Sequence, residues 1–79
     1  MRLDKYLKVS RIVKRRTVAN ELCDAGKATV NGKTAKASYD VKVGDVIELR
    51  IGAKILKFKV TKLLEFVKKE DADTMFEAL

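Results

Sequence analysis

Histidine and proline are absent from this sequence, and cysteine occurs once. Without histidine or a second cysteine the chain cannot assemble a zinc site, and Cys23 cannot form an internal disulfide. Cys23 lies in an apolar helical pattern, which favours a buried structural thiol over a reactive one. The sequence also lacks an apolar run of about eighteen residues and a signal-peptide pattern, so we expect a cytoplasmic protein.

Catalytic groups are scarce as well. The sequence has no Gly-rich phosphate loop and no serine with a candidate base nearby. Asp4 is the only acid in a basic N-terminal segment, where a carboxylate more often orients neighbouring cations than acts as a general base. We therefore expect no catalytic residue, no metal and no cofactor, and a protein that is not an enzyme.

Positive charge is abundant and concentrated at the N-terminus. The chain of 79 residues carries a net charge of +7, and the segment from Arg2 to Arg16 alone carries seven basic residues and one acid. Clustered lysine and arginine bind polyanions by releasing counterions from phosphates, and the arginine fork suits phosphate oxygens. For the scattered lysines further along we favour a purely solubilising role; these are Lys33, Lys36, Lys54, Lys57, Lys59 and Lys62.

Two helices are expected in the first 26 residues. An apolar stripe at helical spacing predicts a short first helix; it consists of Leu3, Tyr6, Leu7 and Ser10. Thr17 is a candidate N-cap for a second helix that stops at Gly26. Its expected inner stripe is Val18, Leu22 and Ala25, with Ala19 and Cys23 beside it. Arg15 and Arg16 would lie at its N-terminus, where the helix dipole disfavours cations and an external anion would offset that cost.

Short strands fill the middle of the chain. Asn31-Gly32 predicts a type I′ hairpin turn between strands at 28–30 and 33–35. Alternating residues predict further antiparallel strands over 46–51 and 54–64, separated by Gly52-Ala53. Beyond them a second helical stripe predicts a short C-terminal helix after a run of acids; it consists of Ala72, Met75, Phe76 and Leu79.

The expected architecture is an α+β domain: two N-terminal helices on a small antiparallel sheet, plus a short C-terminal helix. We assign 1–64 to this domain and 65–79 to an acidic segment packed on it. The first helix is short and the second is basic only at its entry, so neither suits a DNA major groove. We favour RNA, recognised by shape and phosphate.

The motifs RLDKYLKVSR, KRRTVANEL, AGKATVNGKTAKAS and DVKVGDVIEL together resemble the S-four RNA-binding domain, over about residues 2–51. This domain also occurs in pseudouridine synthases, tyrosyl-tRNA synthetases and the fifteen-kilodalton heat-shock protein. A domain standing alone with an acidic, apolar C-terminal segment is most similar to the short bacterial ribosome-quality-control proteins. The resemblance implies an S-four-like fold containing the alpha-L motif.

The resemblance also implies a function and a set of site residues. Such proteins bind split large ribosomal subunits that still carry peptidyl-tRNA, contacting rRNA and tRNA. They support a partner protein that recruits alanyl-tRNA and adds an untemplated alanine tail. Arg16 would be the strongest contact and Asp4 would orient Arg2 or Arg16, while Asn31 and Gly32 would be structural and Ser38 is a further candidate. The RNA-binding candidates are Arg2, Lys5, Lys8, Arg11, Lys14, Arg15, Arg16 and Lys36.

Other functions remain open at this point. The chain could serve ribosome assembly or recycling, or act as a subunit of an RNA-modifying enzyme. It could also be a protein-interaction adaptor with weak RNA binding, using Met75, Phe76 and Leu79 as its docking stripe. We expect a monomer without membrane contact, because the ribosome would supply the large binding surface.

Overall fold

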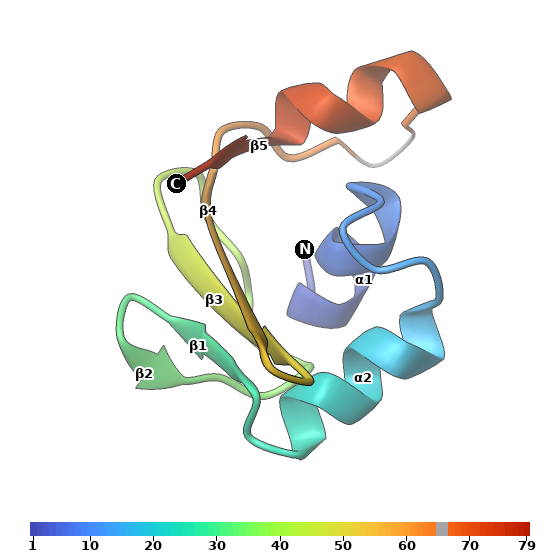
Figure 1. Cartoon of the computed structure of the whole chain (residues 1–79). Helices are drawn as coiled ribbons and strands as arrows, with labels where there is room; N and C mark the ends of the chain where they lie inside the picture. Colours follow the sequence, from blue (N-terminus) through green and yellow to red (C-terminus); the bar gives the residue numbers. More distant parts are fainter. Residues whose placement is uncertain (65–66) are drawn as a thin grey trace.

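The computed structural model describes residues 1–64 and 67–79. Two helices lie on one face of a five-stranded antiparallel sheet with strand order β2-β1-β3-β4-β5 (Figure 1). The predicted α+β architecture is confirmed. The elements in chain order are α1 (Leu3–Val9), α2 (Arg16–Asp24), β1 (Ala28–Val30), β2 (Lys33–Thr34), β3 (Val46–Ile51), β4 (Lys54–Val60), the 3-10 helix η1 (Lys69–Met75) and β5 (Phe76–Ala78).

Helix α1 supplies much of the core, as its apolar stripe predicted. Leu3, Tyr6, Leu7 and Ser10 are all buried. The Tyr6 ring stacks on Phe58 of β4 with centroids 6.5 Å apart, and each buried leucine contributes roughly 1.5–3 kcal/mol of hydrophobic stabilisation. The helix is therefore fixed against the sheet, and its exposed side carries the cations.

The predicted hairpin between β1 and β2 is confirmed. Asn31 and Gly32 both have positive φ, 53° and 83°, as a type I′ turn requires. Val30 pairs with Lys33 across the turn. The next strands also follow the alternation: Ile47 and Leu49 of β3 face the core.

Helix α2 begins two residues earlier than predicted, because its N-cap is Arg15 and not Thr17. Arg15 occupies the N-cap position with extended backbone and no side-chain capping bond, and Arg16 is already helical. The earlier start places Arg16 and Asn20 four residues apart on one helix face. Both side chains reach Asp4; the Arg16 contact was expected from the resemblance, and the Asn20 contact was not.

The inner stripe of α2 also differs from the prediction. Ala19 and Cys23 are buried, whereas Val18 is 41% exposed and Ala25 lies at the exposed C-cap. The buried stripe consists of small residues, which permits close packing. Gly26 has φ 74° and ends the helix as predicted.

The C-terminal part is a short helix followed by a strand. β4 ends at Val60 rather than at residue 64, and the backbone N–H of Thr61 donates to the carbonyl of Met75. Ala72 and Met75 are buried as the stripe predicted. Phe76, however, starts β5 instead of continuing the helix, because Phe76–Ala78 pairs with the free edge of β4.

These contacts make η1 and β5 part of the folded unit. The Tyr6 hydroxyl donates to the Met75 carbonyl over 2.8 Å, and Phe76 packs edge-on against Phe58 with centroids 5.8 Å apart. The expected segment boundary at residue 65 lies outside the described residues. Within the described ranges, no helix has the length and apolarity needed to cross a membrane.

Candidate nucleic-acid interface

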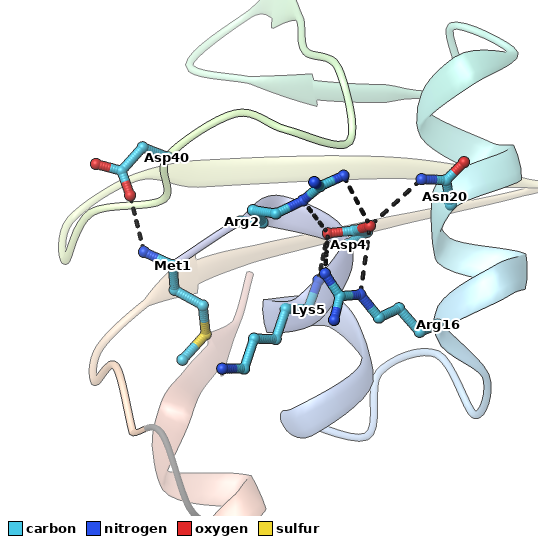
Figure 2. A network of polar contacts seen from close by, with 7 residues as sticks. All are labelled: Met1, Arg2, Asp4, Lys5, Arg16, Asn20 and Asp40. Carbon is cyan, nitrogen blue, oxygen red and sulfur yellow. Dashed lines mark hydrogen bonds and ion pairs between the residues drawn. The ribbon is translucent and has the colours of Figure 1, made fainter.

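Asp4 is the buried centre of a charged cluster on the helical side of the molecule. Its carboxylate accepts from Nε and Nη2 of Arg2 at 3.1 and 3.3 Å, and from the backbone N–H of Lys5 at 2.8 Å. Arg16 approaches with Nε at 3.4 Å and Nη2 at 3.5 Å, and Asn20 Nδ2 donates at 3.3 Å. Figure 2 shows Arg2 and Arg16 reaching Asp4 from two sides. Asp4 therefore contacts both of the arginines that it was predicted to orient.

These partners keep Asp4 ionised. Burial raises the pKa of Asp4, but hydrogen bonds from Asn20, Arg2 and Arg16 and from the Lys5 backbone outweigh it, so the pKa lies below its usual value. The side chains of Arg2 and Arg16 remain about half exposed, while the side chain of Asp4 is 3% exposed. Each arginine thus has one side fixed by Asp4 and the other side open to solvent.

The start of α1 is held by the loop between β2 and β3. The backbone N–H of Leu3 donates to the carbonyl of Tyr39, and that of Asp4 donates to Ala37. Arg2 forms an isolated β-bridge with Asp40, whose carboxylate also lies 2.8 Å from the Met1 amino group (Figure 2). Backbone contacts therefore hold the position of Asp4 in addition to its side-chain partners.

Three further predicted cations gather where α1 ends. Lys8, Arg11 and Lys14 line a surface hollow of about 290 Å³ whose floor includes the buried Val13. All three cationic side chains are exposed. This second cluster shares no lining residue with the hollow beside Asp4 and Arg16.

The other predicted site residues lie apart from one another. Arg15 is exposed at the N-cap of α2, and the side chain of Lys5 is half-buried. Lys36 is exposed and lines a different hollow, next to Lys33 and Tyr39 of the β2–β3 region. The structure therefore groups five of the predicted cations into two clusters, Arg2 and Arg16 at Asp4 and the three at the hollow, and places the side chains of Lys5, Arg15 and Lys36 in neither.

A second buried carboxylate, Asp45, lies in the turn before β3. It accepts from the Tyr39 hydroxyl at 2.9 Å, Asn31 Nδ2 at 3.1 Å and the Lys42 backbone N–H at 3.0 Å. The hydrogen bond to Asp45 raises the pKa of Tyr39, with burial and the charges of Asp45 and Asp40 adding to it. No prediction from the sequence anticipated these partners of Asp45.

Cys23 lies in the core, as predicted. Burial, together with the charges of Asp4 and Asp24, raises the pKa of the thiol to about 11. A thiol with that pKa is protonated at neutral pH and is a poor nucleophile and metal ligand. No group of three or more His, Cys, Asp or Glu side chains that could hold a metal ion occurs in residues 1–64 and 67–79.

The sheet with two helices on one face, and the Asp4 cluster between those helices, define the class of protein. The S4 domain family matches residues 1–47, which contain both helices, the hairpin and both cationic clusters. The chain belongs to the S4 domain family.

Particular relatives are similar over nearly their whole length. The "RQC P-site tRNA stabilizing factor" of Streptococcus pneumoniae is 57% identical over 79 residues, covering all of this chain and 90% of the relative. The protein of the same name from Bacillus subtilis is 51% identical, with 100% and 92% covered. Among solved structures, the trimeric Heat Shock Protein 15 of Vibrio cholerae superposes with a TM-score of 0.91 at 30% identity, covering all of this chain and 81% of that one.

Proposed function

We propose that this chain is a non-catalytic RNA-binding factor whose contact surface is the cationic side of α1, the loop after it and the start of α2. The observation that carries the proposal is the Asp4 cluster: a buried carboxylate holds Arg2 and Arg16 with their outer sides open to solvent. Fixing two arginines in advance reduces the entropy that RNA binding would otherwise cost. Guanidinium groups held this way suit phosphate oxygens.

The RNA targets we propose are large-subunit rRNA and peptidyl-tRNA on split, stalled large ribosomal subunits. The names of the S. pneumoniae and B. subtilis relatives support a P-site tRNA, and their similarity covers the full length of this chain. In this role the chain supports untemplated C-terminal alanine tailing of the nascent chain by a partner that recruits alanyl-tRNA. We propose that it acts on ribosomes in the cytoplasm, and that it does so as a monomer.

One of the three docking residues proposed for the adaptor alternative is inaccessible to a partner. Met75 is fully buried and its carbonyl accepts from Tyr6, so its side chain cannot contact a partner. Leu79 is 61% exposed, but it follows a strand and does not share a helical face with Met75. A continuous apolar stripe for partner docking is therefore not formed.

The test is recovery of the tagged full-length chain from cells, followed by analysis of the associated ribosomal particles. We expect mature large subunits that carry peptidyl-tRNA, and we expect the Arg2→Ala and Arg16→Ala double variant to recover far fewer of them. The Lys54→Ala and Lys57→Ala double variant, which removes two exposed cations of β4, is the charge-matched control. Recovery of immature subunits would support an assembly role instead, and recovery of no subunits would refute the proposal.

A further inference from the structure

Arg11 has a backbone conformation that arginine rarely adopts. Its φ is 64°, in the left-handed region, directly after the C-cap of α1. Its N–H donates to the carbonyl of Lys8, and the N–H of Val13 donates to Leu7, so the position acts as the C′ stop of the helix. Glycine is the usual residue at such a stop because a Cβ is unfavourable there. An arginine at this position costs stability that glycine would not.

The side chain of Arg11 offers no compensation within the chain. It is exposed, and no carboxylate lies within ion-pair distance of it in the described residues. Lys8 and Lys14 line the same hollow and have no such partner in that part of the chain either. Strained residues of this kind accumulate where a side chain serves a function.

The electrostatics of the two cationic clusters differ. Asp4 offsets part of the charge of Arg2 and Arg16, so those three residues carry a net charge of +1. The three cations of the hollow carry +3 with no acid among its lining residues. The negative end of the α1 dipole favours one cation there, Lys8 in the last turn, but it is equivalent to only about half a charge. Most of the repulsion among the three cations is therefore uncompensated within residues 1–64 and 67–79.

We propose that Lys8, Arg11 and Lys14 form the main phosphodiester-binding site of this surface, and that the Asp4 cluster mainly positions the RNA. This inference rests on the proposed RNA-binding function and assigns the strongest phosphate contact to the loop instead of to Arg16. The hollow of about 290 Å³ is lined by three cations and Val13, so its lining offers charge to a phosphate and no aromatic face on which a base could stack.

The decisive variant is Arg11→Gly, measured for thermal stability and for binding of fluorescently labelled unfractionated tRNA over a series of salt concentrations. We expect the melting temperature to rise by about 4 °C, because glycine relieves the left-handed backbone. We expect tRNA affinity to fall about tenfold. The slope of log affinity against log salt should decrease by about 0.7 for each lost phosphate contact. Lys8→Ala and Lys14→Ala should reduce the slope in the same way, and the charge-matched Lys54→Ala should not.

The outcomes separate this inference from the proposed function. If the wild-type chain binds tRNA and Arg16→Ala reduces the salt slope more than Arg11→Gly does, the inference is wrong while RNA binding stands. A variant Arg11→Gly that binds as tightly as Lys54→Ala would also refute it. If the wild-type chain binds neither tRNA nor purified large subunits, the proposed function itself fails.

Discussion

Asp4 and Asp45 are both buried, yet their surroundings differ in kind. Asp4 is bound by two guanidinium groups, an amide and a backbone N–H, whereas the donors to Asp45 are a phenol, an amide and a backbone N–H. Asp45 thus ties the hairpin turn at Asn31 to the loop at Tyr39, and among the described residues it forms no ion pair. A buried carboxylate surrounded by neutral donors fixes shape, while one surrounded by exposed cations also fixes where charge is presented to solvent.

The surroundings of Asp4 and of Asp45 are connected by one loop. Tyr39 donates its hydroxyl to Asp45 while its backbone carbonyl accepts from Leu3, next to Asp4. Loss of Asp45 should therefore loosen the support of α1 without removing any cation. We therefore predict that changes at Asp4 and changes at Asp45 affect stability and RNA affinity differently.

The largest effect on stability is expected for Asp45→Ala. The variant leaves the Tyr39 hydroxyl, the Asn31 amide and the Lys42 N–H without their acceptor, at a cost of about 3 kcal/mol in the free energy of unfolding. Urea unfolding measures this loss. Binding of tRNA at a temperature where the variant is folded should stay within about twofold of wild type, and a larger loss would mean that Asp45 also supports the RNA surface.

Asp4→Asn should reduce both stability and affinity. The amide cannot accept from two arginines and Asn20 as a carboxylate does, and we expect a loss of about 2 kcal/mol in the free energy of unfolding. The variant loses one negative charge, and the resulting rise in net charge would by itself tighten RNA binding. We nevertheless expect tRNA affinity to fall severalfold, because Arg2 and Arg16 lose their fixed positions. Tighter binding by this variant would show that net charge matters and orientation does not.

Tyr39→Phe is a smaller probe of the same comparison. It removes one of the three donors to Asp45 and keeps the ring, so the free energy of unfolding should fall by about 1 kcal/mol. RNA affinity should be unchanged in a titration with labelled tRNA. An equal loss in affinity would place the loop at Tyr39 within the binding surface.

The smallest effect is expected in the pH dependence of stability. The pKa of Asp4 is below its usual value in the folded chain, although burial alone would raise it, so ionised Asp4 stabilises the fold above about pH 4. This contribution is lost as the pH falls through the folded-state pKa. Urea unfolding of wild type and Asp4→Asn from pH 7 to pH 3 should show their difference shrinking at low pH. The Met1 amino group lowers the pKa of Asp40 too. Wild type and Asp4→Asn share that shift, so it cancels in their difference.

Local patterns predicted most of the elements. Periodicity placed α1, and the Asn31-Gly32 pair placed the hairpin, because a type I′ turn depends on two adjacent residues alone. The start of α2 was missed because Arg15 occupies the N-cap position without a side-chain capping bond, so no capping residue marks the start in the sequence. Phe76 was assigned to a helix because its role as a strand depends on the edge of β4, which no local pattern reveals.

In the candidate site, too, some features follow from the sequence alone and others depend on the fold. The sequence by itself determined that positive charge is concentrated between Arg2 and Arg16, since charge depends on composition and order. Only the tertiary structure decided which cations are paired. It placed Asp4 between Arg2 and Arg16, and it gathered Lys8, Arg11 and Lys14 around a hollow without an acid. The physical reason is that ion pairing requires distances of a few ångströms between charged groups. The packing of α1 against α2 and the sheet fixes those distances.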